Sequence, residues 1–323
     1  MKQLKFLCLG LCLISPFYAA SWGFFGHKLI NRMAVFTLPG PLMGFYKQHI
    51  SVITEHAVDP DKRRYSDTAE ACRHYIDLDY YEKSWPIDTV PPNWKDAVAK
   101  YSEDTLLAYG IVPWHIQRML YRLTEAFKSG DAERIIRVSA DLGHYMADAC
   151  VPLHATMNYN GQLTNQKGIH GFWESRLPEL FSDEYDFFVG KSYYLHNPLQ
   201  TAWMASSGSF LAKDSVLEME AQLNHKFPAN QKYVYERKGQ NSVKTYSRSY
   251  AEAYHRMLDG QVERRMRLAI QLTGCMWYTA WVDAGQPDLL QGRQPEISIE
   301  ELQNWMKADY KILHDSLMLG RPE

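Results

Sequence analysis

Histidine and carboxylate side chains recur at close, regular intervals between residues 144 and 174. His144 and Asp148 stand four residues apart, and His170 and Glu174 repeat that interval, with His154 between the two pairs. Side chains four residues apart in a helix project from the same face, so each pair presents an imidazole and a carboxylate together. Imidazole nitrogens and carboxylate oxygens are ligands of zinc in catalytic sites. The two pairs and the intervening histidine therefore predict a metal site, rather than surface hydrogen bonds alone.

Two further groups of candidate ligands precede this cluster. Asp59 lies in the run Asp59–Pro60–Asp61, and His74 opens the run His74–Tyr75–Ile76–Asp77. His27 ends the run WGFFGH, which begins at Trp22. If the chain were cut before Trp22, the free amino group and its neighbouring carbonyl could chelate a metal with His27, and the two glycines would let the backbone fold close to the ion. Taken singly, these residues also fit a hydrogen-bonded core histidine or a buried tryptophan.

The stretches around these residues predict an all-α fold, a single-domain helical bundle. Apolar residues recur at helical spacing over 42–55, 113–127, 132–149, 169–180 and 258–276, and few stretches alternate with period two. The helices over 132–149 and 169–180 would carry the two histidine–carboxylate pairs. The segment 182–244 has no clear period, and we interpret it as an insertion or a cap.

The N-terminus has the pattern of an export signal. Lys2 and Lys5 precede an apolar run over residues 6–14 that is too short to span a bilayer, and the small residues Ala19, Ala20 and Ser21 suit cleavage. The alternative is a buried first helix. We expect an exported protein, periplasmic or secreted and without a membrane span, and we divide the chain into a signal peptide (1–21), a main domain that carries the candidate metal ligands (22–285) and a polar C-terminal tail (286–323).

Composition limits the remaining possibilities. The chain has 323 residues, 46% of them hydrophobic, which suffices for a sizeable core. Cys72, Cys150 and Cys275 lie outside the expected signal and allow at most one disulfide, so the fold must rest on its core and on metal. The formal net charge of −2 argues against a stable nucleic-acid partner, although brief contact with a nucleic-acid substrate is compatible with it. We expect a monomer.

Taken together, the candidate ligands resemble those of the superfamily that unites bacterial zinc-dependent phospholipases C with single-strand-specific zinc nucleases. The resemblance implies an all-α bundle that holds three zinc ions in a cleft. It assigns the first zinc to Asp59, His74, His144 and Asp148. It assigns the second to the amino and carbonyl groups of Trp22, to His27 and to Asp148 as a bridge. It assigns the third to His154, His170 and Glu174.

The resemblance also implies hydrolysis of phosphate diesters, because paired zinc ions supply a nucleophilic water at neutral pH. Asp59 would orient or deprotonate that water. Lys62 stands where the nucleases place a phosphate-binding arginine, with Arg63 as the alternative, although these residues could equally form a solvated basic turn. Tyr75 follows His74 and could contact a base or a lipid headgroup, or pack in the core.

Three hypotheses about function follow, and they differ in whether the protein acts on a lipid, on a nucleic acid or on no substrate. Glu174 and the short interval between His154 and His170 favour a phospholipase C-like enzyme acting on phospholipid headgroups, which is our preferred interpretation. The close Trp22–His27 spacing and Trp173 favour a single-strand-specific DNA or RNA endonuclease, with or without nucleotidase activity. The third hypothesis is a zinc-binding scaffold without catalysis, against which the full set of bridging ligands argues.

Overall fold

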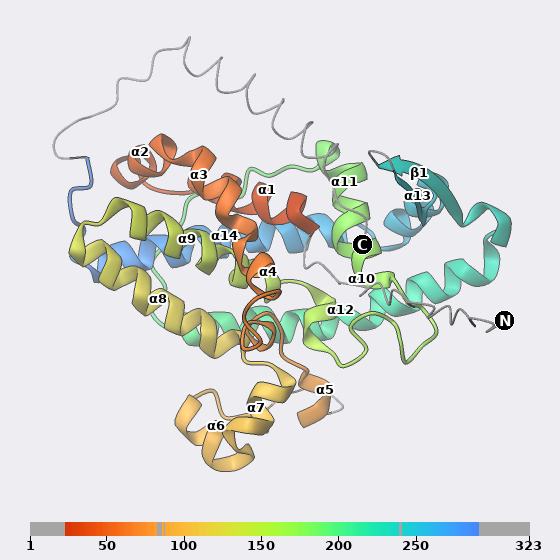
Figure 1. Ribbon diagram of the computed structural model, residues 1–323, viewed down its shortest axis with the longest axis horizontal. Coiled ribbons are helices and arrows are strands. Elements are labelled where there is room, and N and C mark those ends of the chain that lie inside the picture. Colours follow the sequence, from red (N-terminus) through yellow and green to blue (C-terminus); the bar gives the residue numbers. More distant parts are fainter. Residues whose placement is uncertain (1–22, 83–85, 87, 239–240, 291–323) are drawn as a thin grey trace, which may run out of the picture.

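Five helices form the frame of the molecule, and they pack side by side along its long axis (Figure 1). They are α1 (Gly23–Val35), α8 (Val112–Ser129), α9 (Ala132–Asp148), α12 (Pro198–Lys226) and α14 (Gln261–Asp283). The computed structural model describes residues 23–82, 86, 88–238 and 241–290. Within these ranges the fold is an all-α bundle, and the only sheet is one antiparallel hairpin of β1 (Tyr233–Lys238) and β2 (Asn241–Tyr246). The expected fold class is confirmed.

Shorter elements connect the frame. The short α-helices are α2 (Gly40–Gln48), α3 (Ile50–Glu55), α4 (Asp59–Arg63), α5 (Leu78–Tyr81), α6 (Trp94–Tyr101), α7 (Glu103–Tyr109), α10 (Ile169–Gly171), α11 (Leu177–Phe181) and α13 (Arg248–Met257). Single 3-10 turns are η1 (His56–Val58), η2 (Ala71–Arg73), η3 (Pro152–Ala155), η5 (Ser182–Glu184) and η6 (Ala229–Gln231), and η4 (Phe172–Arg176) is a π turn.

Local signals explain why α8 and α9 form an antiparallel pair. Pro113 stands in the first turn of α8, where its missing N–H is no loss. Gly130 ends α8 in the left-handed conformation with φ of 69°. The side chain of Asp131 then caps α9 by accepting the N–H of Arg134 at 3.0 Å. The tight connection aligns α9, which carries His144 and Asp148, against the middle of the bundle.

Aromatic residues fill the core between α2, α9 and α14. Tyr46 stacks on Trp277 with ring centroids 4.9 Å apart, and both side chains are fully buried. Their polar atoms are satisfied on α9, because the Tyr46 hydroxyl pairs with the Ser139 hydroxyl at 2.7 Å and Trp277 Nε1 donates to the Ser139 carbonyl at 3.0 Å. The pair therefore links three helices without an unsatisfied polar group.

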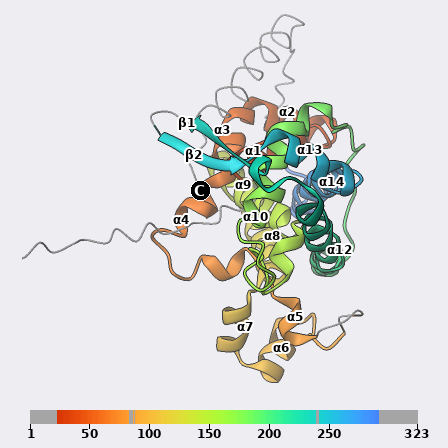
Figure 2. The same cartoon turned by 90° about the vertical axis from the view of Figure 1, so that its right-hand side faces the viewer.

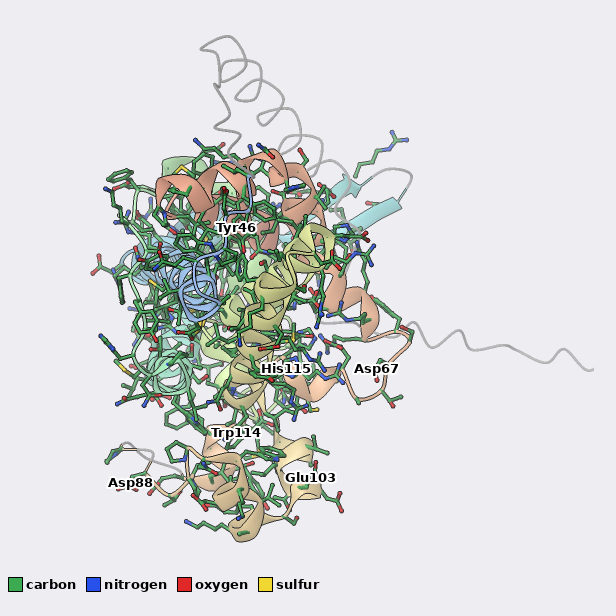
Figure 3. The ribbon with its side chains drawn as sticks, turned by 90° about the vertical axis from the view of Figure 1, so that its left-hand side faces the viewer. Tyr46, Asp67, Asp88, Glu103, Trp114 and His115 are labelled. Atoms are coloured by element: carbon green, nitrogen blue, oxygen red, sulfur yellow. The ribbon has the colours of Figure 1, made fainter. Side chains whose placement is uncertain are left out.

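Helices α5, α6 and α7 form a lobe at one edge of the bundle. Figure 3 shows Asp88 and Glu103 in this lobe and Trp114 where the lobe meets the bundle. Trp114 Nε1 donates to the Pro92 carbonyl at 2.7 Å, and its ring meets that of Trp94 edge-on at 5.3 Å. A tryptophan of α8 thus anchors the lobe.

The segment 182–244 differs most from expectation, because it contains α12, a 29-residue helix. Small residues such as Ala202, Ala205, Ser206 and Ser209 form part of its buried face. Alanine and serine give little hydrophobic contrast, so the helical period is weak in the sequence. The expected helices over 42–55 and 169–180 are present but interrupted, the first at His49 and the second by the π turn.

Some expectations fall outside the described residues. These are the signal peptide at 1–21, Trp22, and most of the expected tail, from residue 291 onward. Across the described ranges, none of the helices combines the length and apolar character that a bilayer-spanning segment needs.

Helices α1 and α9 approach each other closely at a glycine. A Cβ atom at Gly143 would lie 2.0 Å from the Oδ1 atom of Asn31, whose Nδ2 atom donates to the Ala140 carbonyl at 3.0 Å. Gly143 precedes His144, and α1 carries His27. The close approach therefore helps bring two candidate ligands together.

We predict that Gly143→Ala lowers the free energy of unfolding by about 1–3 kcal/mol, because the added methyl group overlaps a buried side chain. Gly40→Ala is the matched control, since a Cβ atom there meets nothing within 4 Å. Urea denaturation followed by circular dichroism measures both variants. Equal midpoints for the two would show that the α1–α9 contact can relax without cost.

Candidate metal centre

Asp148, the last residue of α9, lies at the centre of a buried group of histidines. Its Oδ2 atom is 2.9 Å from His74 Nδ1 and 3.2 Å from His144 Nε2. Its Oδ1 atom is 3.4 Å from His27 Nε2 and 3.6 Å from His154 Nδ1. Because the two carboxylate oxygens face different histidines, this side chain has the geometry of a ligand shared between two metal ions.

A second group lies beside the first and contains His154, His170 and Glu174. His170 Nε2 is 3.1 Å from His154 Nε2 and 2.9 Å from Glu174 Oε2, and all three side chains are buried. The chain passes from α10 into the π turn between His170 and Glu174. π turns are frequent at functional sites, and here the two side chains still converge across the four-residue interval.

The position of Asp59 differs from expectation. Asp59 begins α4, and its partly exposed carboxylate pairs with His56 Nδ1 and with Lys62 Nζ, the latter at 3.0 Å. Hydrogen bonds from these two residues and their positive charges outweigh burial and lower the pKa of Asp59. The structure therefore brings neither Asp59 nor Lys62 to the histidine cluster, and the two bind each other near the surface.

Asp61 occupies the place expected of Asp59. Its Oδ1 atom lies 3.8 Å from both His74 Nδ1 and His144 Nε2. The side chain is buried, and neither oxygen forms a hydrogen bond with any residue that the structure describes. The physical reason is helical register, because two residues of helix turn the side chain by about 200° and α4 points Asp61 inward. A buried carboxylate without hydrogen bonds, facing imidazoles, fits a metal ligand.

Hydrogen bonds to backbone carbonyls orient two of the imidazoles. His144 Nδ1 donates to the carbonyl of Ala57 at 2.8 Å, and His154 Nδ1 donates to the carbonyl of His74 at 2.7 Å. A carbonyl can only accept, so the Nδ1 atoms carry protons and the Nε2 atoms face the cluster, where a metal ion would replace any proton on them. Such outer contacts are typical of metal-binding histidines.

Glu70 contacts His74 on the side of the ring opposite Asp148, and its role was not predicted from the sequence. Its Oε1 atom lies 3.4 Å from His74 Nε2 and accepts a hydrogen bond from the Tyr145 hydroxyl. Burial alone would raise the pKa of Glu70, but the nearby His74 ring, the hydrogen bond from Tyr145 and the charge of Arg63 hold that pKa well below its usual range. Glu70 precedes His74 by four residues, which is the spacing that identified the other pairs.

The electrostatics of the cluster favour a cation. Burial opposes the charged form of His144, but the negative charges of Asp148 and Asp61 raise its pKa to about 9. Burial and the charge of His144 lower the pKa of His27. Protons and metal ions compete for these nitrogens, because zinc binds only the neutral imidazole.

The basic residues Arg63 and Arg64 and the aromatic candidate Tyr75 have different neighbours. Arg63 binds Asp141 with both terminal nitrogens, at 3.2 and 2.9 Å. Arg64 approaches the cluster, with its Nη1 atom 4.0 Å from Asp61 Oδ1. Tyr75 is half-buried, and its hydroxyl donates to the Ala108 carbonyl of α7 at 3.3 Å.

Three sets of side chains therefore have donor atoms close enough to share an ion. They are His27, Asp61 and His144; His74, His144 and Asp148; and His154, His170 and Glu174. Within each set the ligand atoms lie within 4.8 Å of one another, and all are nitrogen or carboxylate oxygen on buried residues. This donor set fits zinc.

Among the comparisons with known proteins, the match to a family model agrees with this chemistry. The family model described as zinc dependent phospholipase C matches residues 26–237. Among solved structures, the alpha-toxin of Clostridium perfringens isolated from the avian strain SWCP is similar, with 13% sequence identity and a TM-score of 0.43. The match covers 84% of this chain and 66% of the toxin chain, so it spans just under two thirds of the toxin's length. No curated protein sequence matches the chain.

We predict that Asp61→Asn lowers the zinc content of the purified protein, because the amide removes a negative charge and an oxygen donor from the cluster. Asp59→Asn is the matched control in the same helix and should keep the wild-type zinc content. Inductively coupled plasma mass spectrometry on dialysed protein measures both. The reverse pattern would restore Asp59 as the ligand and refute the assignment of Asp61.

Proposed function

Because the chain belongs to the zinc-dependent phospholipase C family, we propose that it hydrolyses phospholipids at the phosphodiester bond, releasing a phosphorylated headgroup and diacylglycerol. The observation that carries the proposal is the buried group of imidazoles and carboxylates around Asp148. Such a group is costly to bury without a cation, and a structural zinc needs only one closed set of four ligands. The extent of the cluster therefore supports catalysis over a scaffold role.

The sequence features that favoured a nuclease, Trp173 and the spacing of Trp22 and His27, gain little support from the structure. Trp173 is fully buried and its Nε1 atom donates to Gln261 Oε1 at 3.1 Å, so it packs in the core. Trp22 lies outside the described residues. The short connection between His154 and His170 favours a phospholipase C-like enzyme over a nuclease.

We propose three zinc ions per chain. His74, His144, Asp148 and Asp61 would hold the first, with Asp61 in place of Asp59. His27 and Asp148 would hold the second together with the amino and carbonyl groups of Trp22, exposed when a signal peptide at 1–21 is removed after export. His154, His170 and Glu174 would hold the third. Zinc bound there would supply a nucleophilic water and positive charge for the phosphate.

Residues around the cluster would complete the reaction. Asp61 faces the cluster with oxygens that accept no hydrogen bond from the described residues, so it would orient the attacking water or take its proton. Arg64, rather than Lys62, is placed to bind the phosphate, because only Arg64 approaches Asp61. Tyr75 borders His74 and would contact the headgroup with its ring.

We predict that the wild-type protein beginning at Trp22 binds three zinc ions, that Glu174→Ala binds one fewer, and that Asp148→Asn binds fewer still. Glu174 lies in a single set of ligands, whereas Asp148 faces histidines of more than one set. Zinc content per chain, measured after dialysis, checks the order. Equal losses in the two variants would contradict the bridging role of Asp148.

We predict that phosphorus NMR of the same protein with micellar phosphatidylcholine and a single-stranded oligonucleotide will show a phosphocholine signal. A chelator should abolish that signal. Arg64→Ala should lower the rate by about tenfold or more, because it removes a charged donor to the phosphate, whereas Lys62→Ala should stay near wild type. Mononucleotide signals without phosphocholine would refute the lipid assignment in favour of a nuclease.

A further inference from the structure

Two segments beside the His154–His170–Glu174 group carry exposed apolar side chains. The first is the loop of residues 157–168, which joins His154 to His170. The second is the β1–β2 hairpin. Tyr235 of the hairpin is 71% exposed, and Leu163 and Tyr159 of the loop are 69% and 48% exposed. Large apolar side chains gathered near a site often mark a surface that meets a partner.

The hairpin is fixed close to the metal centre. Tyr246 of β2 stacks on Phe172, with ring centroids 3.8 Å apart and planes 13° from parallel. Phe172 precedes Glu174 by two residues. Arg176, two residues after Glu174, binds Glu236 of β1 with both terminal nitrogens. The hairpin therefore contacts the π turn at two residues that flank Glu174 in the sequence, Phe172 and Arg176.

The loop and the hairpin share one anchor, the buried carboxylate of Glu220 on α12. Gln166 of the loop donates to Glu220 Oε2 at 2.7 Å. Lys232, at the start of the hairpin, and Tyr250 donate to Oε1 at 2.8 and 2.7 Å. Because the same side chain binds both segments, the loop and the hairpin are tied to one point of α12 and form one structural unit. Figure 2 looks onto the end of the bundle where the hairpin and α10 lie.

The charge of this unit opposes that of the whole chain, whose formal net charge is −2. Lys167, Arg237 and Lys244 are exposed, and Lys244 Nζ lies 4.1 Å from the centre of the Tyr233 ring. The only acidic residue of 157–168 and 232–246 is Glu236, which Arg176 binds. Tyrosines among basic residues are typical of surfaces that lie in the headgroup region of a membrane.

We propose that Tyr159, Leu163, Lys167, Tyr235, Arg237 and Lys244 form a docking surface for an anionic phospholipid membrane. The proposal rests on the proposed lipid substrate and adds where the protein meets the bilayer. Tyrosine rings and Leu163 would enter the headgroup layer while the basic groups bind lipid phosphates. Docking there would bring the group formed by His154, His170 and Glu174 close to the headgroups. Leu163 offers an aliphatic surface that lipid favours and that base stacking does not use.

The test is binding to vesicles of phosphatidylcholine and phosphatidylglycerol in a 7:3 ratio, measured by co-sedimentation of zinc-loaded protein beginning at Trp22. Leu163→Ser/Tyr235→Ser should lower the partition coefficient by about tenfold, because two apolar groups leave the interface. The matched control is Tyr121→Ser/Met204→Ser. These residues are 66% and 68% exposed, and Met204 lies sixteen residues from Glu220 along α12, a helical distance of roughly 24 Å. The control should bind within twofold of wild type.

A second readout separates docking from catalysis. The rate on these vesicles divided by the rate on monomeric dihexanoylphosphatidylcholine should fall by about tenfold in Leu163→Ser/Tyr235→Ser and stay constant in the control. Equal vesicle binding by both double variants, or binding to a single-stranded oligonucleotide in place of vesicles, would overturn the docking surface. Variant-sensitive vesicle binding by a protein that hydrolyses no lipid would support docking and refute the proposed function instead.

Discussion

The structure depends on one buried carboxylate, that of Asp148, at the C-terminal end of α9. A helix C-terminus already carries partial negative charge, so an anion buried there needs strong compensation. Burial would raise the pKa of Asp148, but the neighbouring charges of His144 and His154 lower it far below the ordinary value. The surrounding chain is arranged to provide this compensation, with α1 supplying His27 and the segment after η2 supplying His74. The same need for positive charge makes the cluster a place for metal ions.

The sequence predicts this arrangement well where the candidate ligands are close in the chain. The pairs His144–Asp148 and His170–Glu174 are local, so their four-residue spacing alone brings the members of each pair together, in the second case even across a π turn. Asp59 and Asp61 could not be separated in this way, because α4 is a short helix whose register depends on packing against α9 and η1. Glu70 was overlooked although it stands four residues before His74. In α12 the buried alanines and serines conceal a long helix that spacing alone does not reveal.

The candidate metal ligands and the residues proposed to contact a substrate lie on different kinds of structural element. The candidate ligands lie on the long helices α1 and α9 or on short helices and turns beside the frame, and backbone carbonyls such as that of Ala57 orient their rings. The residues suited to touch a substrate, among them Arg64, Tyr75 and the loop 157–168, lie on short connections. This division is common in enzymes, where a stable scaffold positions variable binding segments.

The described ligands extend from His27 to Glu174, and the described cysteines are all free thiols. Ions bound by these side chains would act as cross-links that close long chain loops, as disulfides do in many proteins. Unlike a disulfide, such a cross-link can be withdrawn by any competitor with higher affinity for the metal. The resistance of the protein to proteases would then follow the local supply of zinc, so a chelator would shorten its lifetime at the same time as it removed the catalytic metal.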